Sequence, residues 1–306
     1  MKNETTWAGA PAPPNPIPPA LQALLTGLID YAGMFPPAKL SLEDATNIFL
    51  TSTKSPNAWM LGKFVLPAER LKDLRSTLAD CDATLPLTVL LGPEPKRDAE
   101  KIEAALATDR FAIDAIEFRP GSPAMVRELA AVLPKGLPVF CEGPLMENLD
   151  GWLTAIHHEG WFAKIRTGGL TPESLPTSAA VASFLSQCKA QGIAFKATAG
   201  LHHPVRSEHP LTYEANSPCG VMHGFLNVFL GAALLECGIS QDQFIAILDD
   251  TDPHNFRFEG DFAHWGKLFV NTNDIAGTRE HFAISFGSCS FDEPIQDLQK
   301  LNLLRK

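Results

Sequence analysis

Short runs of apolar residues recur along the chain, and most are followed by a segment with helical periodicity. The runs cover residues 28–32, 63–66, 87–91, 113–119, 138–142 and 283–291, with two more around Lys164 and Lys196. Strands of a parallel sheet are buried on both faces, so they read as nearly continuous apolar segments. The pattern therefore predicts eight parallel strands.

Helices are predicted between these strands. Residues 149–156 and 181–188 place apolar side chains at positions i, i+3, i+4 and i+7, which is typical of an amphipathic helix. The stretch Ser41-Leu-Glu-Asp44 resembles a capping box that opens another helix. Further helices are predicted over residues 69–78, 99–106, 123–133 and 220–235.

Eight strands alternating with helices over 306 residues predict a single (β/α)8 TIM barrel with long loops over its C-terminal face. An open, doubly wound sheet is the alternative, but no G-x-G-x-x-G follows an early strand. Residues 11–19 hold six prolines. We therefore predict a Pro-rich arm over residues 1–20 and a barrel domain over residues 21–306.

Composition narrows the classes of function. The net charge of −10 argues against binding of nucleic acid or of an anionic membrane surface. The sequence contains no run of 18 apolar residues, so no transmembrane helix is predicted. Residues 1–20 lack the apolar segment of a signal peptide. The six cysteines are scattered without a C-x-x-C motif, which favours reduced thiols and a cytoplasmic location.

Charged residues gather where the predicted strands end. In a barrel of this kind, the C-terminal strand ends carry the functional site. Lys164 and Arg166 share one face of their strand and precede a Gly-Gly turn, and Lys196 and Thr198 share a face of the next strand. The candidate site residues are Glu117, Arg119, Glu142, Lys164, Arg166, Thr167, Gly168, Gly169, Lys196, Thr198, His202, His203 and Ser288.

These charges permit two interpretations. They could form a polar layer whose ion pairs satisfy one another inside the barrel. Burying so many charges without a ligand costs free energy, however, so a site for a small anionic substrate is favoured. The acidic chain would need a local basic pocket for such a substrate, and Lys164, Arg166 and Lys196 could supply it.

The two lysine strands resemble those of class I aldolases of the deoxyribose-phosphate aldolase type, a TIM-barrel family. In that family the sixth strand carries a Schiff-base lysine before a Thr-Gly turn, and Lys164 with Thr167 and Gly168 fits this pattern. Residues 196–201, K-A-T-A-G-L, resemble the second-lysine strand K-A-x-G-G-I-R. Residues 114–117, D-A-I-E, are similar to the run D-E-V-D that ends in the catalytic aspartate.

The chain also departs from that pattern at four positions. Arg166 replaces a small residue, Ala199 a glycine, His202 an arginine and Glu117 the aspartate. The resemblance covers about a quarter of the chain. It implies a lyase in which Lys164 forms a Schiff base with a phosphorylated or carboxylated carbonyl compound.

The residues themselves are compatible with this chemistry. A lysine amine attacks a carbonyl only when it is deprotonated, and burial or neighbouring cations such as Lys196 and Arg166 lower a lysine pKa. Glu117 or Glu142 could shuttle protons. Lys164 could equally anchor an anion, with Arg166 as a fork. In that case the protein is a non-catalytic binder of an anionic metabolite.

A third hypothesis depends on residues 201–223, which hold four histidines and form an unusually long loop. We predict that this segment acts as a lid. A divalent metal at these histidines would make the protein a metal-dependent barrel enzyme, although no H-x-x-x-H or H-E-x-x-H spacing is present. Otherwise no cofactor is expected.

Two further segments are assigned structural roles. Residues 252–282, rich in Phe, His and Trp, are expected to cover the barrel mouth or to form a contact in a homo-oligomer. Cys289 could be a nucleophile. A buried structural thiol is the preferred interpretation, because the sequence shows no adjacent base.

Overall fold

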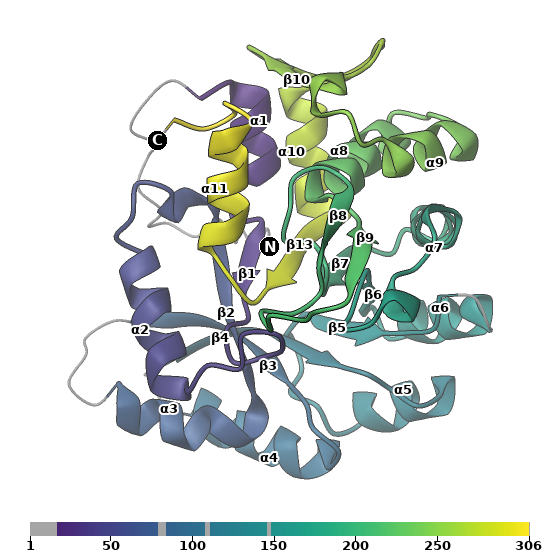
Figure 1. The fold of residues 1–306 in the computed structure, drawn as a ribbon. Coiled ribbons are helices and arrows are strands. Elements are labelled where there is room, and N and C mark those ends of the chain that lie inside the picture. The colour runs from purple at the N-terminus through teal and green to yellow at the C-terminus, as the bar shows by residue number, and fades with distance from the viewer. Residues whose placement is uncertain (1–16, 79–83, 108–110, 146–147, 306) are drawn as a thin grey trace.

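The computed structural model describes residues 17–78, 84–107, 111–145 and 148–305. Eight parallel strands close into a barrel in the order β1-β13-β7-β6-β5-β4-β3-β2, and helices surround it (Figure 1). The predicted (β/α)8 barrel is therefore confirmed, and with it the fold implied by the aldolase resemblance. Residues 1–16 of the predicted arm lie outside the described residues.

The barrel strands lie where the apolar runs predicted them. They are β1 (Ile29–Tyr31), β2 (Leu61–Pro67), β3 (Leu85–Leu90), β4 (Phe111–Phe118), β5 (Val139–Glu142), β6 (Phe162–Arg166), β7 (Phe195–Thr198) and β13 (Ala283–Ser288). The last strand ends at Ser288, three residues before the predicted end at residue 291. Beyond that point the chain turns into the C-terminal helix.

The helices also follow the predicted alternation. They are α1 (Pro19–Leu25), α2 (Leu42–Ser52), α3 (Leu71–Thr77), α4 (Pro95–Leu106), α5 (Pro123–Ala130), α6 (Leu149–His158), α7 (Ser178–Ala190), α8 (Phe225–Glu236), α9 (Gln241–Asp249), α10 (Thr272–His281) and α11 (Asp292–Lys300). Short 3-10 turns lie at η1 (Ala58–Met60), η2 (Ala68–Arg70), η3 (Pro172–Ser174) and η4 (Pro253–Asn255). Ser41 caps α2 by accepting a hydrogen bond from the Asp44 N–H, as its motif predicted.

Helix α1 corrects the boundary of the predicted arm. It begins at Pro19, and Ala20, Leu21 and Leu24 are fully buried. Proline is compatible with the first turn of a helix, because its missing N–H would have no intrahelical partner there. Ile17 also packs against the core, so residues 17–20 of the predicted arm belong to the packed fold.

A β-hairpin covers part of the C-terminal face of the barrel. Strands β8 (Ser207–Pro210) and β9 (Cys219–Met222) pair antiparallel within the long segment between β7 and α8 (Figure 1). The helix predicted over residues 220–235 therefore begins later, at Phe225. The sequence does not show this boundary, because an apolar pattern does not distinguish a short strand from the start of a buried helix.

A second small sheet lies outside the barrel. Strands β10 (Phe256–Glu259), β11 (Phe262–Trp265) and β12 (Leu268–Asn271) form an antiparallel sheet that packs near α1 and α8. The N–H of Ala20 donates to the carbonyl oxygen of Gly260 at 3.2 Å. No residue of 252–282 lines the cavity at the barrel mouth, so the prediction that this segment covers the mouth is wrong. A role in an oligomer contact stays a prediction.

Among the described helices, none combines the length and apolar character that crossing a bilayer requires.

Candidate functional site

The register of the barrel strands places four polar residues side by side. Glu142 pairs with Lys164 across β5 and β6, and Lys164 pairs with Lys196 across β6 and β7. Lys196 in turn pairs with Ser285 on β13. Register partners in a parallel sheet point to the same face. The closure of the barrel therefore brings both lysines and a carboxylate into one interior layer.

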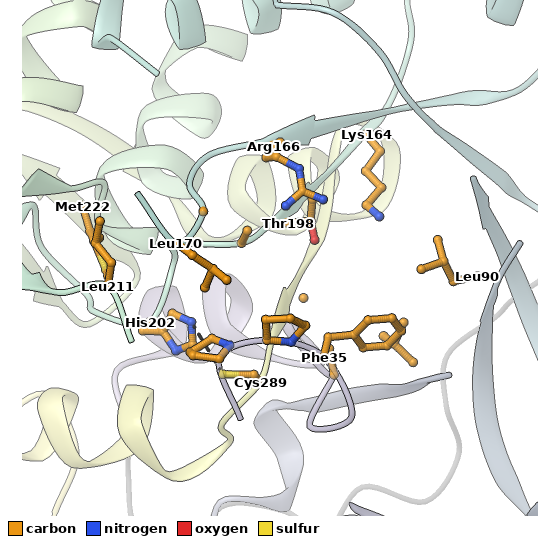
Figure 2. A pocket seen from close by; sticks show the side chains of 18 of the residues that line it. Phe35, Leu90, Lys164, Arg166, Leu170, Thr198, His202, Leu211, Met222 and Cys289 are labelled. Carbon is orange, nitrogen blue, oxygen red and sulfur yellow. Dashed lines mark hydrogen bonds between the residues drawn. The ribbon is translucent and has the colours of Figure 1, made fainter. Parts of the chain in front are cut away.

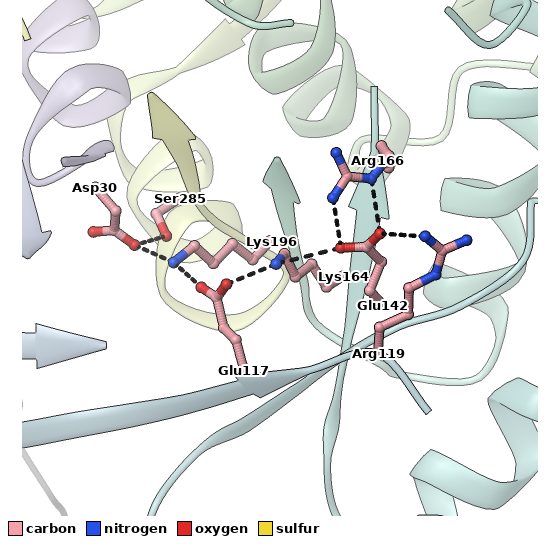
Figure 3. Close-up of polar contacts among 8 residues, drawn as sticks. All are labelled: Asp30, Glu117, Arg119, Glu142, Lys164, Arg166, Lys196 and Ser285. Carbon is pink, nitrogen blue, oxygen red and sulfur yellow. Dashed lines mark hydrogen bonds and ion pairs between the residues drawn. The ribbon is translucent and has the colours of Figure 1, made fainter. Parts of the chain in front are cut away.

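Carboxylates and ammonium groups alternate through this layer (Figure 3). The Lys196 Nζ lies 2.6 Å from Asp30 Oδ2 and also contacts Glu117 Oε1. The Lys164 Nζ lies 2.8 Å from Glu117 Oε2 and 3.4 Å from Glu142 Oε2. Glu117 thus bridges the two lysines, and all five side chains are buried.

Both ends of this network are held by further groups. Arg166 forms a fork on Glu142, with Nε 2.8 Å from Oε1 and Nη2 3.3 Å from Oε2. Arg119 is more distant, with Nη1 3.8 Å from Glu142 Oε1. At the other end, Asp30 accepts hydrogen bonds from the Ser285 hydroxyl at 2.8 Å and from the backbone N–H of residue 63 at 2.6 Å.

The charges set the protonation of the buried groups. Burial opposes ionisation of Glu117, but the ammonium groups of Lys164 and Lys196 outweigh it and lower the Glu117 pKa to about 2. Burial likewise disfavours the charged form of Lys196, yet Asp30 and Glu117 raise its pKa. The Glu142 pKa is lowered, because Lys164 and Arg166 outweigh its burial. These three groups therefore remain ionised at neutral pH.

The charges nearest to Lys164 differ from those that the sequence predicts. The sequence predicts that the cations Lys196 and Arg166 are the neighbours that make Lys164 reactive. Both cations are close, but Glu142 lies between Lys164 and Arg166, and Glu117 lies between Lys164 and Lys196. The nearest charges to the amine are therefore the carboxylates of Glu117 and Glu142. The role of Lys164 stays a prediction.

A cavity of about 370 Å³ opens above this layer at the C-terminal ends of the strands. Glu117, Lys164 and Arg166 form its charged part, and Figure 2 shows Lys164 and Arg166 on one side of it. The walls are largely apolar, with Phe35 after β1 and Leu211 beside the hairpin. A cavity with few polar groups and apolar walls is typical of a small-molecule site.

The structure brings only some of the predicted site residues to this cavity. Those that line it are Glu117, Lys164, Arg166, Gly169, Thr198 and His202. Those that do not line it are Arg119, Glu142, Thr167, Gly168, Lys196, His203 and Ser288. Lys196 is enclosed by its carboxylate partners, with a relative exposure of 2%. It therefore supports Glu117 instead of facing the cavity.

Thr167 and Gly168 shape the cavity rim through backbone contacts. The Thr167 hydroxyl donates to the carbonyl oxygen of Ala199 at 2.6 Å, which fastens the end of β6 to the turn after β7. Ala199 has a φ of 60°, in the left-handed region that costs an alanine about 1–2 kcal/mol. A Cβ on Gly168 would lie 2.8 Å from the Gly200 Cα. Glycine is thus needed at Gly168 for the close approach of the two turns.

Several lining residues were not predicted from the sequence. They include Phe35, Pro36, Pro37, Leu90, Leu170, Leu211, Met222 and Cys289. The Phe-Pro-Pro stretch lies in the loop after β1, so its position near a strand end is a signal that the sequence offers. Leu211 and Met222 reach the cavity only because the β8–β9 hairpin folds over it. No local pattern in the sequence predicts that arrangement.

The histidines of the long loop have separate partners. His203 Nδ1 lies 2.6 Å from Asp297 Oδ2, and the His203 ring stacks on His209. His223 Nε2 lies 2.9 Å from the carbonyl oxygen of Pro176. Within the described part of the chain, no three His, Cys, Asp or Glu side chains converge on a position that could hold a metal ion. A metal at this loop stays a prediction.

Comparisons with known proteins find a partial likeness to a solved structure. No protein-family model and no curated protein matches the chain. Among solved structures, the chain is similar to a deoxyribose phosphate aldolase from Aeropyrum pernix, described as having a unique tetrameric structure. The TM-score is 0.44 with 16% identity over 62% of this chain and 87% of that chain.

The low pKa of Glu117 predicts an acid-sensitive contribution to stability. An unfolded glutamate titrates near pH ~4.3, whereas folded Glu117 titrates near pH 2. Its stabilising contribution should therefore be complete above pH ~4.3 and be lost as the pH falls towards 2. Urea unfolding of the parent and of Glu117→Gln between pH 6 and pH 2.5 tests this. The difference between their unfolding free energies should shrink on acidification, and a pH-independent difference would contradict the assignment.

Proposed function

We propose that this protein is a barrel enzyme that acts on a small carbonyl compound with a phosphate or carboxylate group, through Schiff-base formation at Lys164. The observation that carries the proposal is the position of Lys164. Its side chain is buried, yet it lines the cavity, and Glu117 lies 2.8 Å from its amine. A nucleophile with an acid–base group within hydrogen-bond reach, at the floor of an apolar cavity, is the arrangement that covalent catalysis requires.

The two carboxylates determine how the amine would become reactive. Attack on a carbonyl carbon needs the lone pair of a neutral amine, so the Lys164 ammonium must first release a proton. Transfer to Glu117 or Glu142 removes one positive and one negative charge together, so no isolated charge remains in the barrel. After attack, one proton of the nitrogen passes to the former carbonyl oxygen and gives the carbinolamine. The protonated Glu117 can then return its proton when the carbinolamine hydroxyl leaves as water. Glu117 thus serves both the amine and the substrate oxygen, whereas Glu142 does not line the cavity.

Arg166 supports the choice of an anionic substrate. Its side chain is 44% exposed and lines the cavity, while its fork is held by Glu142. The guanidinium has five N–H donors, so donors remain after the two bonds to Glu142. A phosphate or carboxylate at this position would sit beside Lys164. The alternative, a non-catalytic binder in which Lys164 and Arg166 both anchor the anion, uses the same contacts.

Borohydride reduction separates these functions. The protein is incubated with a panel of small aldehydes and 2-oxo acids, reduced, digested and analysed by mass spectrometry. We expect a reduced adduct on Lys164 that is lost in Lys164→Arg. Lys196→Arg serves as the matched control, because Lys196 lies in the same layer but does not line the cavity. The adduct on Lys164 should persist in that variant if it folds.

Two results would contradict the Schiff-base proposal. Labelling of Lys196 instead of Lys164 would show that Lys196 is the reactive amine. A folded protein that no carbonyl compound labels, but that binds inorganic phosphate less tightly after Lys164→Arg, would favour the anion-binding function.

A further inference from the structure

A second group of reactive side chains lines the same cavity. Cys289 follows β13, and His202 follows β7; both line the cavity on the side away from Lys164 (Figure 2). The Cys289 Sγ lies 3.9 Å from His202 Nε2. The sequence interpretation of Cys289 as a structural thiol depended on the lack of an adjacent base. The fold supplies that base from a residue 87 positions away.

A carboxylate fixes the orientation of the histidine ring. His202 Nδ1 lies 2.9 Å from Glu293 Oε2, on the opposite side of the ring from the sulfur. A carboxylate accepts only, so Nδ1 carries the proton and the Nε2 lone pair faces the thiol. The order thiol, imidazole, carboxylate is the arrangement that activates cysteine nucleophiles. The 3.9 Å separation is long, as such contacts often are without a ligand.

Tyr213 completes the cluster from the loop between β8 and β9. Its hydroxyl donates to Glu293 Oε2 at 3.1 Å and lies 3.6 Å from the Cys289 Sγ. Burial, Cys289 and Glu293 all raise the Tyr213 pKa, so the phenol stays neutral and keeps its proton. That proton is donated to Glu293, so Tyr213 helps to hold the carboxylate that orients His202.

Titratable side chains from several elements surround the Cys289 thiol. They are His202 after β7, Tyr213 beside the hairpin, Tyr31 on β1 and Glu293 on α11. Tyr31 is neutral, because burial and then Cys289 raise its pKa to about 12. Burial lowers the His202 pKa, but Cys289 and Glu293 outweigh it and raise the pKa to about 9. His202 can therefore hold the proton that it takes from the thiol.

We propose that Cys289 is a nucleophile, with His202 as its base and Glu293 as the orienting carboxylate, which adds reversibly to the carbonyl carbon of a ligand in the cavity. His202 takes the thiol proton, and the sulfur lone pair forms the S–C bond. The C=O π pair moves to oxygen, which then receives the proton from His202. The product is a hemithioacetal, and no oxidant or reductant is consumed. The proposal goes beyond the Schiff-base function, because it requires Cys289 and not Lys164.

Alkylation with iodoacetamide, followed by peptide mapping, tests the first part of this proposal. Cys289 should react at pH 7 about tenfold faster than an unactivated thiol, because a thiolate replaces a thiol that is only a few per cent ionised. Its rate should depend on pH less steeply than that of an ordinary thiol, because His202 accepts the thiol proton within the pair. An ordinary thiol would instead react faster with each step up to its own pKa near ~8.5. Cys219, which is exposed, serves as the internal reference.

The chain offers a matched control for the histidine. His203 and Asp297 form a second histidine–carboxylate pair between the same loop and α11. His203 contacts Asp297 and the His209 ring, not a sulfur atom. His202→Asn should reduce the Cys289 rate about tenfold and restore an ordinary pH profile, whereas His203→Asn should change neither. Glu293→Gln, at a partly exposed position, gives a second test if His202→Asn fails to fold. It should lower the rate by a smaller factor.

Aldehyde competition tests the carbonyl addition. Acetaldehyde and glyoxylate, added without borohydride, should slow the alkylation of Cys289, and dialysis should restore the rate. The protection should persist in Lys164→Arg, so it can succeed where the Schiff-base proposal fails. Alkylation of Cys289 at the same rate in the parent and in His202→Asn would overturn the proposal. Fast alkylation that neither aldehyde slows would overturn the carbonyl addition.

Discussion

Replacing Lys196 with methionine is expected to lower the free energy of unfolding by about 3–5 kcal/mol. Lys196 is buried between Asp30 and Glu117, and both contacts are direct. Methionine is close to lysine in length, so the main change is the loss of one positive charge. Asp30 then loses its ammonium partner, and Glu117 keeps only that of Lys164, in a region that excludes water. Urea unfolding monitored by tryptophan fluorescence measures the effect.

Two variants separate charge from packing in this experiment. Asp30→Asn combined with Lys196→Met removes one charge of each sign, so it should recover part of the stability that Lys196→Met loses.

Lys101→Met is the comparison near the surface. The Lys101 Nζ lies 2.7 Å from Asp98 Oδ1, nearly the same distance, but the lysine is 37% exposed. Asp98 is buried but keeps its hydrogen bond from the Gly92 N–H, and Lys101 reaches solvent, so the loss in Lys101→Met should be smaller. Equal losses in Lys101→Met and Lys196→Met would contradict the role of burial.

Replacing Gly200 with alanine is expected to destabilise the protein by about 2–4 kcal/mol and to displace the cavity rim. Gly200 has a φ of 76°, which an alanine adopts at a cost of about 1–2 kcal/mol. The added Cβ would also lie 2.9 Å from the Cα of Gly168 and 3.2 Å from the carbonyl oxygen of Thr167. Both are backbone atoms, so the turns after β6 and β7 must move apart.

Gly192 provides a control with the same backbone conformation and no steric conflict. Its φ is 66°, and a Cβ built there meets no atom within 4 Å. Gly192→Ala should therefore show only the conformational cost, about 1–2 kcal/mol. The difference in unfolding free energy between Gly200→Ala and Gly192→Ala measures the cost of the contact with Gly168. If both variants lose the same stability and retain the Lys164 adduct, the close approach of the two turns has no energetic or functional role.

The buried charge network connects stability with the proposed chemistry. A buried ion pair often contributes no more stability than well-packed apolar residues of similar volume. The layer here holds two lysines and three carboxylates directly beneath a cavity with apolar walls. Stability alone does not require this arrangement. The proposed chemistry, in contrast, uses paired acids and bases at the cavity floor and would account for the charged layer.

The sequence by itself determined the barrel and its strands. Strands buried on both faces must be apolar along their whole length, so the runs that contain Ile29, Leu87 and Phe286 are visible without knowledge of their neighbours. The position of Lys164 at a strand end is equally local. Since parallel strands of a barrel end at one face, this position alone placed the lysine near the mouth.

Only the tertiary structure decided which groups meet. The pairing of Lys164 with Glu117 and Glu142 depends on strand register and barrel closure, which are set by contacts far apart in sequence. The meeting of Cys289 and His202 depends on a loop conformation that no periodic pattern encodes. Local periodicity reports burial of a single element, whereas the distances between functional atoms arise only when all eight strands close around one core.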